Sequence, residues 1–170
     1  MSEEAKQNDF AAMAAPVAEH EKMTPFIGTF RAEVMIWMGP GDPQKSTGTM
    51  TNSFVLGGRF LRQEYKGDPN DGPFPEFEGH GYWGFNKAIG KYEGLWIDNA
   101  STIMQTDRGD VDDSGKRWEM IGEMAGPDGN TFVKRSVITL EDDDRHSIEM
   151  FFNHGGQESK AMEIRYTRNT

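Results

Sequence analysis

The sequence predicts a mainly β protein: an antiparallel meander closed into a barrel of about ten strands, with a short helical segment before it. The first observation is composition, because aromatic residues make up 11% of the 170 residues and glycine occurs 20 times. The second is that apolar residues repeat with a period of two from about residue 26 onward. The third is that turn residues recur about every 8 to 15 residues. A closed barrel is favoured because closure removes exposed strand edges, and a two-sheet sandwich is the structural alternative.

The N-terminal part of the chain is expected to begin with a flexible polar tail at residues 1–8, and residues 9–170 are expected to form a single barrel domain. Helical spacing follows the tail, with apolar positions at Phe10, Met13, Ala14 and Val17. Pro16 breaks a continuous helix but suits the first turn of a second short helix over about 16–23. The Ala-rich start lacks a basic region, so a secretory signal peptide is not expected.

The strand candidates follow in order, each bounded by Gly, Pro, Asn or Asp turn residues. The first, "FIGTFRAEVMIWM", places Phe30, Val34 and Ile36 on one face and Arg31 and Glu33 on the other. The next candidates are "TGTMTNSFVL", "RFLRQEYK" and "FEGHGYWGF". The remaining ones are 91–98, 101–107, 116–124, 131–140, 146–153 and 160–168.

The stretch "FVLGGRFLRQEYKG" predicts a hairpin with Gly57 and Gly58 as a two-residue turn, because positive φ at both positions favours glycine. Leu56 then pairs with Arg59, and a phosphate-binding loop is not indicated, because no helix or Lys-Ser/Thr pair follows. This register separates an apolar face from a polar one, which a one-residue slip would not do. The predicted inner face comprises Met50, Asn52, Phe54, Leu56, Arg59, Leu61, Gln63 and Tyr65.

Polar and aromatic side chains on the predicted inner faces are the candidate ligand-binding residues. Asn52 and Gln63 lie opposite each other, and they either satisfy one another or a buried water, or orient a ligand in a cavity. Arg59 lies at a barrel rim, where it caps carbonyls, pairs with an acid or contacts an anion at the mouth. The other candidates are rings that either pack in the core or line a cavity: Tyr65, Trp83, Trp96 and Tyr166. Trp96 is placed inward, although the pattern of 91–98 leaves the inward face undecided.

Segments in the chain resemble the DUF1579 family, a group of uncharacterised proteins with a lipocalin-like, calycin-type barrel. They are "EHEKMTPFIGTF", "FVLGGRFLRQEY", "GHGYWGFNKAIGKYEGLWIDNAST" and "MEIRYTR", and in order they span most of residues 19–168. The calycin resemblance implies that a Gly-x-Trp on the first strand packs with a basic residue on the last and closes the barrel. The corresponding residues here are Gly28, Phe30 and Arg168, with Phe in place of Trp. Their implied role is structural, and the family implies no activity.

Several classes of function are disfavoured by composition. A net charge of −10 without a basic patch argues against nucleic-acid binding, and no apolar stretch approaches a membrane span. The chain has no cysteine, and its histidines show no metal-ligand spacing, so no metal or cofactor is predicted. Haem bound through His146, which shares a face with Ile148 and Met150, is an alternative. We expect a soluble, acidic, cytoplasmic protein.

The predicted barrel is most consistent with binding a small apolar or aromatic molecule in an internal cavity. An enzyme of isomerase, cyclase or hydrolase type that uses the same cavity is one alternative, and it requires a titratable group deep inside. A structural or self-associating barrel with a filled interior is another, and a homo-oligomer is left open. The sequence contains no catalytic motif that decides between them.

Overall fold

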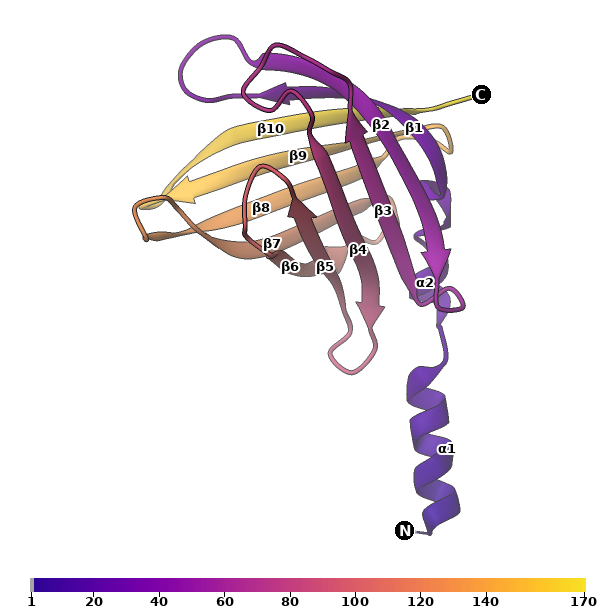
Figure 1. Cartoon of the computed structure of the whole chain (residues 1–170). Coiled ribbons are helices and arrows are strands. Elements are labelled where there is room, and N and C mark those ends of the chain that lie inside the picture. The colour runs from indigo at the N-terminus through magenta and orange to yellow at the C-terminus, as the bar shows by residue number, and fades with distance from the viewer. Residues whose placement is uncertain (1) are drawn as a thin grey trace.

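Residues 2–170, which the computed structural model describes, form a closed barrel of ten antiparallel strands (Figure 1). Each strand pairs with the next along the chain, and the last strand pairs with the first. The predicted meander barrel is confirmed, and the sandwich is not adopted. The strands are β1 (Gly28–Ile36), β2 (Gln44–Val55), β3 (Phe60–Gly67), β4 (Glu78–Asn86), β5 (Lys91–Asp98), β6 (Gln105–Val111), β7 (Arg117–Ala125), β8 (Thr131–Leu140), β9 (Arg145–His154) and β10 (Gln157–Arg168). The segment before them contains α1 (Glu3–Ala14), α2 (Ala18–Glu21) and the 3₁₀ turn η1 (Thr24–Phe26).

Helix α1 begins at Glu3, so it includes residues 3–8, which the sequence analysis assigned to a flexible tail. Most of these residues are good helix formers, and acids in the first turn favour the helix dipole. The helix extends away from the barrel (Figure 1). Its last carbonyls accept hydrogen bonds from the barrel, including one of 2.9 Å from Lys87 Nζ to Ala15 O. Among residues 2–170, no helix is long and apolar enough to cross a bilayer.

Strand β6 differs most from its predicted position, because it runs from Gln105 to Val111 instead of over 101–107. Ile103 and Met104, whose apolar side chains suggested the earlier start, lie exposed before the strand. The inward positions of β6 include Asp107, so apolar alternation does not mark this strand. Strand β6, which apolar periodicity misplaced, therefore places the carboxylate of Asp107 inside the barrel.

The hairpin of β2 and β3 has the predicted register, with Asn52 opposite Gln63. Its turn is wider than predicted, because φ is already positive at Leu56 (50°) and residues 56–59 all belong to the turn. The predicted pairing of Leu56 with Arg59 is therefore wrong, and Leu56 is 70% exposed rather than internal. The other inner-face residues are buried or half-buried: Met50, Asn52, Phe54, Leu61, Gln63 and Tyr65.

The end of the barrel nearest α2 is closed by η1 and the residues beside it. Met23 and Phe26 are buried and pack into the apolar cluster inside the barrel. The Phe26 ring meets Trp83 and Trp118 edge to face, each at 5.3 Å between centroids. Asn52 Nδ2 donates a hydrogen bond of 2.8 Å to Phe26 O. Because this end is filled, a ligand has room only further inside the barrel.

Arg168 joins the last strand to the same closing segment. Its Nη1 donates to Ile27 O at 2.7 Å and its Nη2 to Pro25 O at 2.9 Å. The guanidinium lies over the Phe30 ring, 4.6 Å from the centroid. Gly28 has φ of 126°, and a Cβ there would collide with Arg168 Nη1. The residues that the resemblance assigned to barrel closure therefore lie in mutual contact.

Candidate functional site

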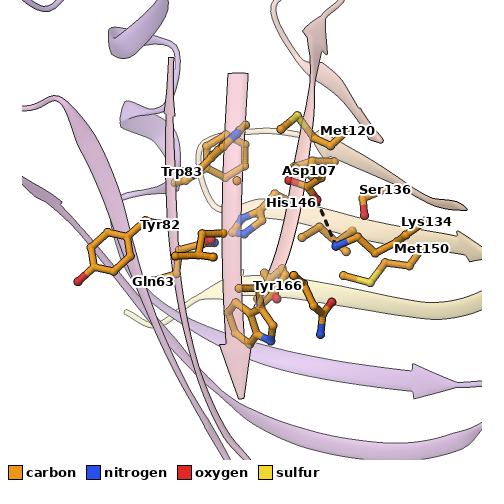
Figure 2. Close-up of a pocket in the computed structure, with 17 residues that line it drawn as sticks. Gln63, Tyr82, Trp83, Asp107, Met120, Lys134, Ser136, His146, Met150 and Tyr166 are labelled. Carbon is orange, nitrogen blue, oxygen red and sulfur yellow. Dashed lines mark ion pairs between the residues drawn. The ribbon is translucent and has the colours of Figure 1, made fainter. Parts of the chain in front are cut away.

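A cavity of about 100 Å³ lies inside the barrel (Figure 2). Phe26 lines its end nearest the closing segment, and strands β3 to β10 supply the walls. The lining includes Trp83 and Met120 from one buried apolar cluster and Tyr166 from the other. Polar and charged side chains lie among these rings and thioethers. The cavity therefore combines an apolar surface with a few placed polar groups, as small-molecule sites do.

An ion pair lies in the wall of this cavity. Lys134 Nζ is 3.2 Å from Asp107 Oδ2, and the two side chains are 4% and 15% exposed (Figure 2). Asp107 comes from β6 and Lys134 from β8, so one strand separates them. That strand, β7, places Gly122 opposite Lys134, and a Cβ there would lie 3.2 Å from Asp107 Cβ. The same Cβ would collide with Thr106 O, so glycine at 122 serves first the close approach of the β6 backbone, and the two charged groups meet beside it across β7.

A second glycine borders the same carboxylate. Gly94 of β5 pairs with Asp107, and a Cβ at Gly94 would collide with Asp107 Oδ1. At Gly94 the carboxylate of Asp107 therefore occupies the space that a side chain would fill. Glycine inside a strand is unfavourable unless it serves a close approach of this kind.

His146 lies at the centre of an aromatic cluster that borders the cavity. Its ring stacks on Tyr166 at 4.5 Å between centroids and meets Phe26 and Phe30 edge to face at 4.9 and 4.6 Å. Burial, and then the nearby charge of Arg168, lower the pKa of His146 to about 3. Burial also raises the pKa of Tyr166. Both rings are therefore neutral at pH 7.

Several buried polar atoms on cavity-lining residues have no hydrogen-bond partner within the described chain. They are Ser136 Oγ, His146 Nδ1 and Trp83 Nε1. Buried polar groups in folded proteins are nearly always paired, and each exception calls for an explanation. A bound molecule with polar atoms would supply the missing partners.

Four of the ligand-binding residues predicted from the sequence line the cavity: Gln63, Trp83, Trp96 and Tyr166. Trp96 points inward, as the sequence analysis favoured, and its Nε1 donates to Asp98 Oδ2 at 2.9 Å. Its ring fills the space beside Gly79 and Gly81. The space beside these two glycines is therefore occupied by a side chain of the protein itself.

The other predicted ligand-binding residues lie outside the cavity lining. Asn52 Nδ2 donates to Phe26 O rather than to Gln63, and its Oδ1 has no partner among the described residues. Tyr65 is buried against Phe77, with the ring centroids 5.7 Å apart. Arg59 lies at the closed end, where its Nε donates to Ala14 O at 2.8 Å and its Nη1 to Leu56 O. Its contacts are the carbonyl caps that the sequence analysis gave as one alternative.

Asp107, Lys134 and Ser136 were not predicted from the sequence as candidate ligand-binding residues. The signal for β8 was available, because Lys134 and Ser136 share their phase with Ile138 and Leu140, which face inward. No such pattern marked Asp107, because its strand was predicted over 101–107 and lies at Gln105–Val111.

Metal and haem binding depend on how His, Cys, Asp and Glu side chains are arranged. No group of three or more His, Cys, Asp or Glu side chains is arranged there to hold a metal ion. His146, the candidate haem ligand, is enclosed by Phe26, Phe30 and Tyr166. A porphyrin needs far more room than a cavity of about 100 Å³ offers. The residues around His146 therefore do not fit a haem.

The fold and the site define a class of closed antiparallel barrel with a small internal cavity that contains a charged pair. The model of the DUF1579 family, described as proteins of unknown function, matches residues 15–168. The chain belongs to this family, and the resemblance drawn from the sequence is confirmed. No match is found among curated proteins.

Two solved structures share the fold. The crystal structure of Rv2717c from M. tuberculosis is 15% identical, with a TM-score of 0.65 over 92% of this chain and 100% of that one. The S-type phycobiliprotein lyase CPES from Guillardia theta is 10% identical, with a TM-score of 0.60 over 91% of this chain and 99% of that one. At these identities, the likeness extends to the fold alone.

Proposed function

We propose that the protein binds one small, largely aromatic molecule inside the barrel. The observation that carries the proposal is the cavity itself, which places unpaired polar atoms of Ser136, His146 and Trp83 among apolar surfaces. A barrel that serves only as a scaffold has no need for such atoms, because each one left unpaired lowers the stability by about 1–3 kcal/mol.

The volume of the cavity restricts the size of the ligand. An apolar cavity of roughly 150 Å³ is enough to bind benzene, and this cavity measures about 100 Å³. Met120 and Met150 line the space, and methionine side chains adapt readily to a bound molecule. This volume is smaller than the one that holds benzene, so a short chain fits the cavity as it stands and a single ring fits only if Met120 and Met150 move aside. In this proposal, Trp83, Trp96 and Tyr166 contact the ring, and Gln63 orients a polar group.

Ligand screening with tryptophan fluorescence and thermal shift tests the proposal. A bound aromatic molecule should quench the emission and raise the melting temperature, because ligands that bind the folded state stabilise it. A Ser136→Met variant fills the cavity and should abolish both signals. The matched control is Ser147→Met, on the outer face of the neighbouring strand β9, which should leave them intact.

The proposal fails if a library of small aromatic and apolar compounds produces no response in the wild-type protein. A self-associating barrel would then be the remaining interpretation, and light scattering on the same samples would measure its oligomeric state.

An enzyme that uses the same cavity is a second candidate, and the Lys134–Asp107 pair favours it. An ammonium and a carboxylate inside a cavity are groups that transfer protons in isomerisation or hydrolysis. NMR spectra of each bound compound before and after incubation would show turnover. Turnover that is lost in Lys134→Met would establish an enzyme, whereas unchanged spectra for every bound compound would leave a binding protein.

A further inference from the structure

We infer that the molecule bound in the barrel is electrically neutral and presents a hydrogen-bond acceptor and a donor side by side, as a primary amide does. The acceptor binds Lys134 and Ser136, and the donor binds Asp107. This inference rests on the proposed function and narrows its ligand class.

First, the buried ion pair is unfavourable for the stability of the fold. Burying two ions requires their removal from water, and replacing such a pair with apolar side chains is often neutral or stabilising. Nevertheless, Gly94 leaves space for the carboxylate of Asp107, and Lys134 is almost completely buried. The pair therefore contributes something other than stability.

The second step is the hydrogen-bonding capacity that the pair leaves over. An ammonium group has three donors and an ionised carboxylate has two acceptor oxygens. Lys134 Nζ has Asp107 Oδ2 as its ion-pair partner among the described residues. Ser136 lies two residues further along β8, on the same face, and its Oγ is unpaired. One side of the cavity thus offers an ammonium and a hydroxyl to an acceptor, and the carboxylate to a donor (Figure 2).

The third step is the charge balance of the cavity. Lys134 and Asp107 cancel each other, and the other titratable groups that line the cavity, His146 and Tyr166, are neutral at pH 7 because of burial. An anion or a cation would add an uncompensated charge beside two charged side chains that are only 4% and 15% exposed, which is unfavourable. A neutral group with both a donor and an acceptor satisfies the site without adding charge.

The fourth step places the ring. Trp83 and Gln63 lie on the side of the cavity opposite Lys134 and Ser136, with His146 between them (Figure 2). A planar ring attached to the polar group would therefore extend from the ion pair toward Trp83.

Three probes of nearly the same shape test the inference: benzamide, benzoate and benzamidinium, with charges of 0, −1 and +1. Isothermal titration at pH 7 should show that benzamide binds the wild-type protein at least about tenfold more tightly than either ion. Asp107→Asn leaves Lys134 without a counter-charge, so this variant should bind benzoate more tightly than benzamide. The matched control is Asp110→Asn on the same strand, which breaks the exposed pair with Lys91 and should keep the preference for benzamide.

The outcomes separate the inference from the proposed function. The inference is overturned if benzoate or benzamidinium binds as tightly as benzamide. It is also overturned if library compounds bind while benzamide does not. In both cases the proposed binding function still stands. An unchanged preference in Asp107→Asn overturns it as well. If no compound binds, the proposed function fails and the inference fails with it. The double variant Lys134→Met/Asp107→Leu, which contains no unpaired charge, covers the case in which Asp107→Asn does not fold: it should bind toluene and lose benzamide.

Discussion

Arg168 and Lys134 both bring a positive charge into the barrel, but their surroundings differ. The guanidinium of Arg168 is held by the carbonyls of Pro25 and Ile27 at the closed end. Lys134 faces a cavity and has the carboxylate of Asp107 as its ion-pair partner within the described chain. The donors of Arg168 are occupied by these carbonyls, by Asp143 O and by the carboxylate of Asp144, whereas Lys134 retains donors for another molecule. The same kind of charge is therefore structural at one end and available for binding in the interior.

Neutral polar groups show the same contrast. Asn52 donates to Phe26 O and so fixes the closing segment. Ser136, which is equally buried at 3% exposure, has an unpaired Oγ within residues 2–170. Asn52 Oδ1 and Trp118 Nε1, near the closed end, also lack partners within the described residues. The contrast therefore lies in the Asn52 donor, which holds the chain, and the Ser136 hydroxyl, which belongs to a residue that lines the cavity.

The largest expected effect comes from removing one half of the buried ion pair. Lys134→Met leaves Asp107 as an uncompensated buried charge and should lower the free energy of unfolding by about 3–5 kcal/mol in urea denaturation. Lys134→Met/Asp107→Leu should recover most of that loss. Lys91→Met, which breaks an exposed pair with Asp110, should change stability by less than about 1 kcal/mol. Equal effects at Lys134 and Lys91 would contradict the contrast between the interior and the surface.

The next largest effect is the response to acid, which His146 should dominate. Its pKa in the folded state, about 3, lies below the value near 6.5 expected in the unfolded chain. The unfolded chain therefore takes up a proton first as the pH falls, and stability decreases from about pH 6.5 downward. At pH 5, the loss from this residue should be about 2 kcal/mol relative to pH 7.

Urea denaturation of wild type and His146→Phe at pH 7 and pH 5 measures this loss as the difference between the two proteins. His80→Phe serves as the control, because His80 is exposed on the outer face of β4. If wild type and His146→Phe lost the same free energy of unfolding between pH 7 and pH 5, His146 would not be held neutral in the folded protein.

A smaller effect is expected from the polar contact that holds the closing segment. Asn52→Ala removes the donor to Phe26 O and should cost about 1–3 kcal/mol, because a buried carbonyl then loses its partner. Ser53→Ala, at the next position on the outer face of β2, should change the stability by about 0.5 kcal/mol or less. Thermal unfolding of both variants would reveal the difference, and similar melting temperatures would argue against a role for Asn52 in closure.

The smallest effect is expected at the attachment of α1. Arg59→Met removes the hydrogen bond to Ala14 O, and the barrel should lose no more than about 0.5 kcal/mol of stability. Trypsin should nevertheless cleave after Lys6 faster than in wild type, because one of the two side chains that hold the end of the helix, Arg59 and Lys87, is lost. Arg62→Met on the outer face of β3 should leave this cleavage rate unchanged. An unchanged rate in Arg59→Met would show that α1 does not depend on this contact.

Much of the fold could be predicted from the sequence because alternation of apolar and polar residues marks a half-buried strand. The register of β2 and β3 is an example, since a one-residue slip would put Leu61 and Met50 on opposite faces. Strand β6 could not be placed in this way, because its inward positions include Asp107 rather than large apolar residues. The role of Asn52 was also out of reach, because its partner Phe26 O belongs to a segment whose position is set by tertiary packing.

The candidate site was only partly predictable for the same reason. Aromatic residues such as Trp83 and Trp96 stand out in any sequence, although the pattern of 91–98 left the inward face of Trp96 undecided. The charged half of the site depends on Asp107 and Lys134 meeting across β7, and the strand that contains Asp107 was placed too early along the chain. Apolar alternation does not mark a strand whose inward positions are polar.

Methionine methyl NMR during a benzamide titration tests the central claim, binding inside the barrel, most directly. Met120 and Met150 line the cavity, whereas Met13, Met38 and Met104 are exposed and serve as controls within the same spectrum. The account predicts that the methyl signals of Met120 and Met150 shift and saturate while those of the exposed methionines stay in place. Shifts confined to the exposed methionines, or unchanged Met120 and Met150 signals at saturating benzamide, would contradict it.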